Sequence, residues 1–271
     1  MSESTPEHAA PEPTALNATL VERVDMNPSQ LICRVRLDEG ALPPFEPGQF
    51  ASLGLPPDDP ARATGSSGLV KRPYSIASAP RDDAVEFFIR LVDGGAFTPL
   101  LWRLGVGDRL WMDNKAVGKF TLDGVEDGKD LLLVSTGTGI SPFLSMVRHY
   151  RGQGRWRRVV MVNGVRIEED LGYREELENL ARVDRDVFYF PLCSREAVPG
   201  PWSGLHGHVT KALEPAFYAA AVGASLDPEQ TQVFLCGNPA MIETVENHLG
   251  ELGFRPHTKR NPGQIHKERY W

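Results

Sequence analysis

The spacing of apolar residues along this chain changes close to residue 128, and that change limits the folds that the chain can adopt. Upstream, short runs alternate apolar and polar side chains, so that Leu31, Cys33 and Val35 share one face. Such runs, separated by Pro, Gly and Asp, are typical of half-buried antiparallel strands. Downstream, continuous apolar runs such as residues 131–135 alternate with segments of helical spacing. The sequence therefore predicts an antiparallel β-barrel followed by a doubly wound α/β parallel sheet.

Three segments follow from this division. Residues 1–14 are rich in Pro, Glu, Ser and Ala, which predicts a disordered N-terminal tail. We expect a barrel domain in residues 15–128 and an α/β domain in residues 129–271.

Composition and cysteine count exclude several classes of protein. The chain is 41% hydrophobic with a formal net charge of −7, which is typical of a soluble globular protein and disfavours nucleic acid as a partner. No apolar run approaches the length of a membrane span, and the first residues lack the features of a signal peptide, so we expect a cytoplasmic protein. Three cysteines without a CxxC pair are too few for an iron–sulfur cluster, and their spacing does not suit zinc. We expect reduced thiols and no metal.

The stretch "STGTGISPF" follows the first buried run and opens the first helical segment. Gly137 and Gly139 allow a sharp turn and a close approach of the backbone to a ligand. A helix N-terminus offers free N–H groups and a positive dipole end to phosphate, and Pro142 suits the first helical turn. The pattern predicts a nucleotide phosphate site, although a tight turn without a ligand is the alternative.

The ends of the next two predicted strands carry arginines where an NAD site would carry an acid. Arg166 ends the second strand, and Ser194 and Arg195 end the third. Because the carboxyl ends of adjacent parallel strands meet at one edge, these groups can converge on a 2′-phosphate. This favours NADPH over NADH, unless the arginines pair only with neighbouring glutamates.

Five motifs occur in an order that resembles the bacterial, FAD-containing ferredoxin/flavodoxin–NADP⁺ reductases. They are "RPYS", "GTGISP", "SRE", "CGNP" and the ending "ERYW", and the resemblance covers the chain from about residue 17. It implies a Greek-key type barrel that binds FAD and an α/β sheet that binds NADP(H). The implied activity is an exchange of electrons between NADPH, a hydride donor, and ferredoxin or flavodoxin, which take single electrons.

The resemblance also implies the FAD contacts. Arg72 would neutralise the pyrophosphate, Tyr74 would lie against the isoalloxazine, and Ser75 would hydrogen-bond near its reactive nitrogen. The other implied contacts are Pro73, Phe88, Arg90, Leu91, Val92, Ala96, Phe97, Thr98 and Thr138. The terminal Tyr270 and Trp271 would fold back over FAD near its adenine, and a core aromatic pair is the alternative.

The implied NADP(H) contacts come from the second half of the chain. They are Gly137, Thr138, Gly139, Arg166, Ser194, Arg195, His208, Cys236 and Gly237. Cys236 would approach the nicotinamide, while Gly139 and Gly237 would leave room for the ring. His208 stands where the family often has a third Arg, which predicts a weaker or more pH-dependent preference for NADP(H). An ordinary surface histidine is the alternative.

Three residues are implied in catalysis: Ser75, Cys236 and Glu268. Ser75 and Glu268 would hydrogen-bond around the reacting atoms. For Cys236 the competing interpretation is packing as a small hydrophobe, since no base stands beside it in the sequence. For Glu268 it is a solvent-facing position in the C-terminal tail.

The resemblance leaves the acceptor and two other functions open. An acidic ferredoxin or flavodoxin could meet the basic stretch between Arg255 and Arg269, which is otherwise a solvated tail. We expect a monomer. A stand-alone flavin reductase, or an oxygenase reductase without an iron–sulfur domain, is the second candidate enzyme. A nucleotide-binding sensor without flavin is the alternative that is not an enzyme.

Overall fold

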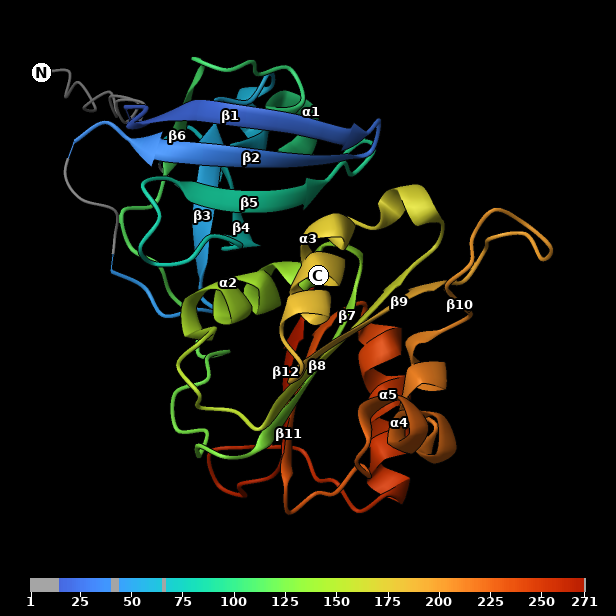
Figure 1. The fold of residues 1–271 in the computed structure, drawn as a ribbon. Helices are drawn as coiled ribbons and strands as arrows, with labels where there is room; N and C mark the ends of the chain where they lie inside the picture. Colours follow the sequence, from blue (N-terminus) through green and yellow to red (C-terminus); the bar gives the residue numbers. More distant parts are fainter. Residues whose placement is uncertain (1–14, 40–43, 65–66, 271) are drawn as a thin grey trace, which may run out of the picture.

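The computed structural model describes residues 15–39, 44–64 and 67–270, which form two domains, one above the other in Figure 1. The expected disordered tail, residues 1–14, and Trp271 lie outside the described residues. Among the residues described, no helix is both long enough and apolar enough to cross a bilayer.

The first domain is an antiparallel barrel of six strands. Its strands are β1 (Ala18–Asn27), β2 (Gln30–Leu37), β3 (Phe50–Leu55), β4 (Val70–Ser75), β5 (Val85–Arg90) and β6 (Arg109–Met112). They follow the order β4-β3-β6-β1-β2-β5, and an antiparallel bridge between Ile76 and Phe87 joins the two edges. The alternating residues Cys33 and Val35 point into its core with no exposed surface. The barrel predicted from this alternation is confirmed.

The second domain is a parallel sheet covered on both faces. Its strands are β7 (Asp130–Thr136), β8 (Arg158–Val165), β9 (Val187–Cys193), β10 (Leu205–His206), β11 (Thr231–Gly237) and β12 (Ile265–Arg269). They follow the order β10-β9-β8-β7-β11-β12, and every pairing is parallel. The order reverses between β7 and β11, and in open α/β sheets the carboxyl ends at such a reversal form a ligand crevice. The doubly wound sheet is confirmed.

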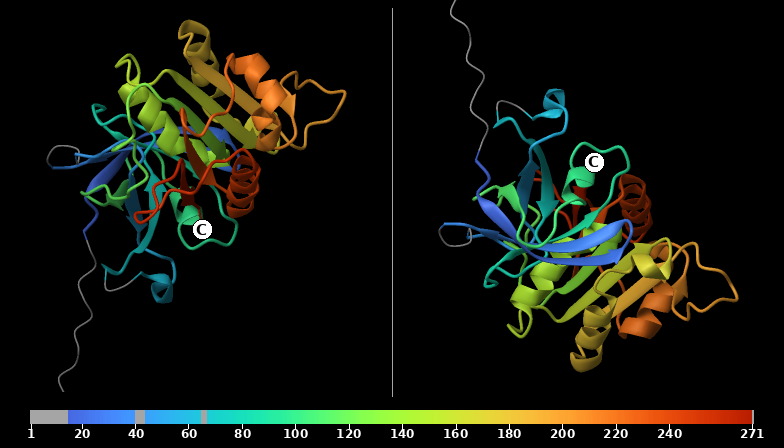
Figure 2. Two further views of the ribbon diagram at one scale, coloured as in Figure 1. Left: turned by 90° about the horizontal axis from the view of Figure 1, so that it is seen from below. Right: turned by 90° about the horizontal axis from the view of Figure 1, so that it is seen from above.

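Two pairs of helices cover the faces of this sheet (Figures 1 and 2). Helices α2 (Ser141–Tyr150) and α3 (Arg174–Val183) bury apolar side chains against Leu131 and Leu133. Helices α4 (Pro215–Val222) and α5 (Pro239–Glu251) cover Leu132 and Val134. Successive β7 side chains therefore enter different cores, which explains why its sequence is a continuous apolar run. The barrel side chains Phe88 and Phe120 join the α2–α3 core, so the two domains share packing.

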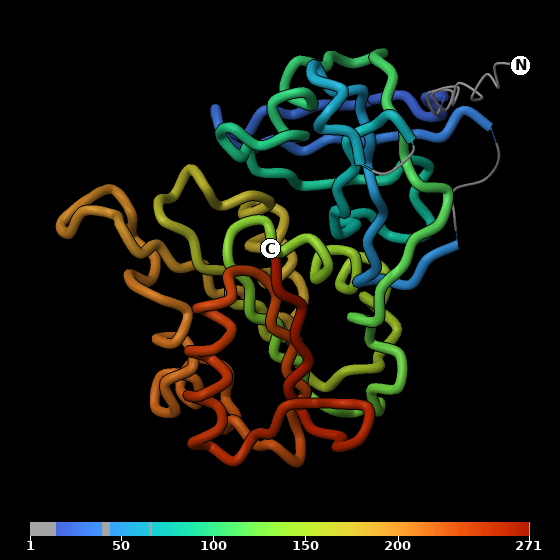
Figure 3. Tube along the Cα trace, turned by 180° about the vertical axis from the view of Figure 1, so that it is seen from behind, coloured from blue at the N-terminus to red at the C-terminus, as the bar shows by residue number. Residues whose placement is uncertain are grey.

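The C-terminal strand β12 runs toward the barrel (Figure 3) and is anchored by stacked rings. The His266 ring lies parallel to Phe234 at a centroid distance of 4.4 Å and stacks on His257 at 4.3 Å. Its Nε2 lies 3.2 Å from Oε1 of Gln232. Burial, together with the nearby His257, lowers the pKa of His266 to about 4.

This lowered pKa predicts a loss of stability on acidification. Between the ordinary histidine pKa of about 6.5 and a pKa of about 4, the unfolded chain binds a proton that the folded chain does not. Above pH ~6.5 the free energy of unfolding is not reduced by the protonation of His266. As the pH drops toward 4 the free energy of unfolding falls, by on the order of 1–3 kcal/mol. Urea unfolding of the wild type and of His266→Gln at pH 4.5 and 7 measures it, because pH 7 lies above the transition and pH 4.5 near its acid end. An equal loss in both proteins would contradict the assignment to His266.

Candidate active site

A cleft of about 1270 Å³ lies where the barrel meets the carboxyl ends of the parallel strands. Strands β4 and β5 form its barrel wall, and the opposite wall comes from the ends of β7, β8, β9 and β12 and the start of α5. Its volume exceeds the ~300–1,000 Å³ of most single-ligand sites, so the cleft can hold more than one ligand.

Most of the residues predicted from the sequence line this one cleft. They are Arg72, Pro73, Tyr74, Ser75, Phe88, Arg90, Leu91, Val92, Thr98, Gly137, Thr138, Arg166, Ser194, Arg195, His208, Glu268 and Tyr270. Of the predicted residues that the structure describes, five do not line it: Ala96, Phe97, Gly139, Cys236 and Gly237.

The barrel wall presents a cation, aromatic rings and free N–H groups. The Arg72 guanidinium is exposed, and it donates a 2.8 Å hydrogen bond to the Lys71 carbonyl. Phe97 is buried beneath Tyr74, with ring centroids 5.7 Å apart, so it supports the wall instead of lining it. Within the described chain, the backbone N–H groups of Ala96 and Phe97 have no protein acceptor. These N–H groups can therefore receive an anion.

Ser75, Glu268 and Tyr270 form a hydrogen-bonded cluster between the two walls. The Ser75 hydroxyl donates to Oε1 of Glu268 at 3.2 Å and accepts from the Tyr270 hydroxyl at 3.0 Å. Burial raises the pKa of Glu268, and the Ser75 hydrogen bond only partly opposes this shift. Glu268 is therefore not a solvent-facing tail residue, and its carboxyl group can hold a proton more readily than an exposed glutamate.

One prediction about this region needs correction. Cys236 has no exposed surface and belongs to the core beneath the cleft, where burial raises its thiol pKa well above the usual value. Packing as a small hydrophobe describes it better than contact with a ligand. Tyr270 lies beside Ser75, and the predicted contact of the Tyr270–Trp271 end with FAD near its adenine stays a prediction. The parallel pairing of β12 with β11 carries Tyr270 past Gly237 to the end of β4, where its N–H donates to the Gly237 carbonyl.

The opposite wall brings two arginines together at the ends of β8 and β9. The N–H of Arg195 donates to the Arg166 carbonyl at 2.8 Å, so the two residues are held side by side. Among the described residues, neither guanidinium has an ion-pair partner. The neighbouring glutamates are engaged elsewhere, because Glu168 pairs with Arg174 and Glu196 accepts from the Glu168 N–H. The structure does not show the alternative in which the two arginines pair with these glutamates at the surface.

Gly139 and Gly237 have a structural reason to be small that the sequence did not predict. A Cβ on Gly139 would lie 2.4 Å from the Cys236 carbonyl oxygen. One on Gly237, whose φ is +136°, would lie 2.4 Å from Oγ1 of Thr136. Both atoms belong to the protein, so these glycines allow the loops after β7 and β11 to pack closely at the switch point.

We therefore expect Gly139→Ala to destabilise even the flavin-free chain. Overpacking against backbone costs about 1–3 kcal/mol, which urea unfolding measures directly. Gly250→Ala on α5 is the matched control, because nothing lies within 4 Å of its added Cβ and helix propensity should favour alanine. Unchanged stability of Gly139→Ala, with only ligand binding affected, would restore the original prediction.

Several cleft residues were not predicted from the sequence. Asp170 lies 3.6 Å from the Arg90 guanidinium across the cleft, and Arg269 ends β12 beside Glu268. Asn238 caps α5 by accepting from the Ala240 N–H, and its own N–H donates to Oγ1 of Thr136. The Asn-Pro of "CGNP" is a helix-start signal that could have indicated Asn238. Nothing in the local sequence singles out Asp170.

Comparison with known proteins points to one family. Residues 133–247 match the model of the oxidoreductase NAD-binding domain. The chain is 40% identical to ferredoxin–NADP reductase B of Sorangium cellulosum, covering 83% of this chain and 85% of that protein. It is 31% identical to the flavodoxin/ferredoxin–NADP reductase of Escherichia coli, covering 84% and 88%. A Neisseria gonorrhoeae ferredoxin NADP⁺ reductase structure with bound FAD and NADP aligns with a TM-score of 0.81 at 29% identity, covering 93% and 97%.

Proposed function

This chain belongs to the ferredoxin/flavodoxin–NADP reductase family, and from that premise we propose that it uses FAD to exchange electrons between NADPH and ferredoxin or flavodoxin. One observation carries the proposal. Arg72 of the "RPYS" strand and Arg166 of the paired arginines are 94 residues apart in the sequence, yet both line the same cleft. FAD supplies, when bound, the exchange between a hydride and single electrons.

The barrel wall fits FAD. Arg72 and the N–H groups before α1 (Thr98–Leu101) provide charge and donors for a pyrophosphate, while Tyr74 and Phe88 offer apolar surface to a flat ring. The tilted Phe97 ring beneath Tyr74 holds the phenol in place. We assign Leu91, Val92 and Ala96 to the same cradle, Ala96 through its N–H alone.

The sheet wall fits NADP(H). Arg166 and Arg195 would bind the 2′-phosphate, with the Ser194 hydroxyl beside them and His208 at the start of the next turn. The turn Gly137–Ile140 presents the N–H groups of its first residues to a phosphate, as helix starts do. Because the third cation is a histidine, this chain should prefer NADPH less strongly than a homologue with arginine there.

The Ser75–Glu268–Tyr270 cluster would serve the reacting atoms. Ser75 orients Glu268 by donating to it, and Tyr270 fixes the Ser75 hydroxyl by donating in turn. Glu268, with its raised pKa, can hold a proton close to where the hydride is exchanged. Cys236 supports this cluster from the core and takes no part in covalent chemistry.

The domain boundaries, the oligomeric state, the cellular location and the site for the electron-transfer partner are also part of the proposal. We assign FAD to residues 15–128 and NADP(H) to residues 129–271, in a monomer that works in the cytoplasm. Arg269 at the cleft and the neighbouring basic stretch would meet an acidic electron-transfer protein.

Steady-state reduction by NADPH separates the candidate functions. We expect ferredoxin or flavodoxin to be reduced far more efficiently than free FMN, with kcat/KM falling steeply as salt is added because the encounter is electrostatic. Preference for free FMN, without salt dependence, would instead support a flavin reductase. A folded protein that binds no flavin would leave only the sensor function.

A further inference from the structure

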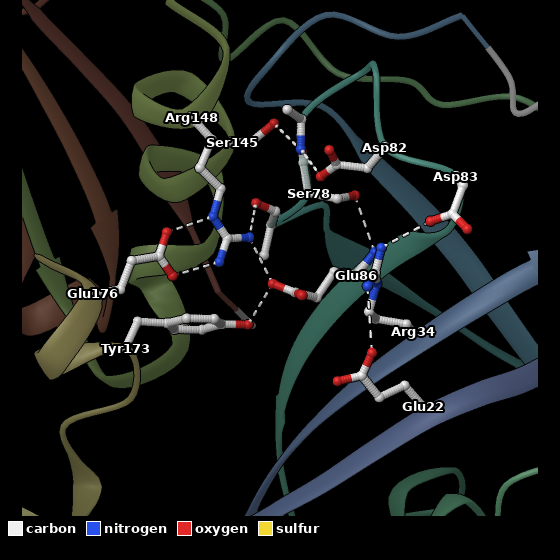
Figure 4. A network of polar contacts seen from close by, with 12 residues as sticks. Glu22, Arg34, Ser78, Asp82, Asp83, Glu86, Ser145, Arg148, Tyr173 and Glu176 are labelled. Carbon is white, nitrogen blue, oxygen red and sulfur yellow. Dashed lines mark hydrogen bonds and ion pairs between the residues drawn. The ribbon is translucent and has the colours of Figure 1, made fainter. Parts of the chain in front are cut away.

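Arg148 of α2 joins the two domains through one side chain (Figure 4). Its Nη1 donates to the Ala77 carbonyl at 3.0 Å and to Oε1 of Glu86 at 2.7 Å, and both acceptors belong to the barrel. Its Nε and Nη2 donate to the two carboxylate oxygens of Glu176 on α3, at 2.8 and 2.6 Å. One guanidinium therefore ties a barrel strand to two helices of the other domain.

Further contacts converge on the same barrel segment. The buried Ser145 hydroxyl donates to the Ser78 carbonyl at 2.7 Å, and the Tyr173 hydroxyl donates to the Oε1 of Glu86 that Arg148 holds, at 2.9 Å. The Ser78 hydroxyl accepts from the Glu86 N–H at 3.0 Å, which fixes the start of β5. We call Arg148, Glu86, Glu176, Tyr173 and Ala77 the interdomain clamp.

The clamp is largely sheltered from solvent. The exposed fraction is 22% for the Arg148 side chain and 14% for that of Glu86. Burial opposes the charge on Arg148, but hydrogen bonds and the charges of Glu176 and Glu86 outweigh it and raise its pKa. The guanidinium stays charged, and removing it would leave a buried carboxylate without its cation.

The strand that the clamp holds is also the barrel wall of the cleft. Glu86 is the second residue of β5, and Phe88 and Arg90 on the same strand line the cleft. The Phe88 ring meets Tyr173 edge-on at 5.4 Å, and a Cβ on Gly172 would lie 2.4 Å from Phe88. The Phe88 ring therefore packs closely on the backbone at Gly172. Because Glu86 and Phe88 lie on the same strand, a shift of the clamp would move the Phe88 wall relative to the sheet.

We infer that Arg148 is a positioning residue for hydride transfer, which it serves by fixing the β5 wall against the carboxyl ends of the parallel strands. This inference rests on the proposed function, because the clamp would set the geometry between two ligands bound on opposite walls. Arg148 does not line the cleft, so its effect on the reaction passes through Glu86 and Phe88.

Kinetics of Arg148→Met test the inference in the FAD-loaded enzyme. Misalignment costs up to about 100-fold in rate, so we expect kcat per bound flavin to fall about 10- to 100-fold, with the KM for NADPH changed less than about threefold. Arg148→Lys keeps the positive charge but loses the planar guanidinium that donates to several acceptors at once, and it should recover part of kcat. Arg182→Met is the control, since Arg182 is exposed and donates to Asn179 on the same helix, α3. An unchanged kcat per bound flavin in Arg148→Met overturns the inference.

A second measurement needs no cofactor. Cys33, Cys193 and Cys236 are buried, so spin labels would attach selectively to Val106→Cys in the barrel domain and Glu251→Cys at the end of α5. In the flavin-free chain, we expect Arg148→Met to broaden or shift the distance distribution between the labels, and Arg182→Met to leave it unchanged. Equal distributions in wild type and Arg148→Met overturn the clamp. If the clamp passes this test but the protein takes up no FAD, the proposed function fails and the interdomain contact stands.

Discussion

Replacing Ser75 by alanine is expected to lower kcat for NADPH oxidation about 100-fold. The hydroxyl donates to Glu268 and accepts from Tyr270, so its loss leaves both groups without that partner in a buried setting. FAD content should change little, because the pyrophosphate and ring contacts come from other residues. Stopped-flow reduction by NADPH, with flavin content measured on the same samples, gives both quantities.

The pH profile distinguishes this role from simple loss of packing. The Ser75 hydrogen bond lowers the pKa of Glu268 against the rise caused by burial, so Ser75→Ala should raise that pKa further. At a given pH, less of Glu268 would then be ionised, and the acid limb of the profile would move to higher pH. Ser135→Ala is the control, because Ser135 is equally buried and bonds only within the sheet. An acid limb that moves in both variants, or in neither, contradicts the assignment.

Arg195→Ala should lower kcat/KM for NADPH about 10- to 150-fold while leaving NADH almost unaffected. Losing a charge-assisted hydrogen bond costs about 1.5–3 kcal/mol, and each 1.4 kcal/mol is a factor of about ten. The Arg195 guanidinium has no ion-pair partner among the described residues, so its loss leaves no protein carboxylate unpaired. The change in coenzyme selectivity therefore reports contact with the 2′-phosphate.

Two further variants sharpen this result. Arg182→Ala removes a positive charge from α3, where the side chain only donates to Asn179, and it should alter neither coenzyme. His208→Arg supplies the third cation typical of the family and should increase the preference for NADPH. If Arg195→Ala weakened NADPH and NADH equally, the 2′-phosphate assignment would be wrong.

The fold could be predicted because the patterns of apolar residues that specify its strands lie within short segments of the sequence. Alternation with period two identified the barrel strands, and the continuous run at 131–135 identified a strand covered on both faces. The cleft was predictable for a related reason. Residues that follow parallel strands must meet at one edge, so Gly137, Arg166 and Arg195 could be placed together without knowledge of any long-range contact.

The interdomain clamp could not be predicted in this way. Arg148 and Glu86 are 62 residues apart, and each resembles an ordinary polar residue on its own helix or strand. The surroundings of Cys236 and Tyr270 could not be predicted either. The order of the motifs places a residue on a strand, but it does not show which side chains cover that residue. Only the packing of β12 against β11 puts Tyr270 at Ser75 and Cys236 in the core.

The most direct test of the account is an anaerobic titration of the purified protein with NADPH, followed by visible absorption. We predict a yellow protein with one FAD per chain, whose flavin bands are bleached by about one equivalent of NADPH and restored by oxidised ferredoxin or flavodoxin. A correctly folded protein without flavin bands, or with bands that NADPH leaves unchanged, would contradict the central claim.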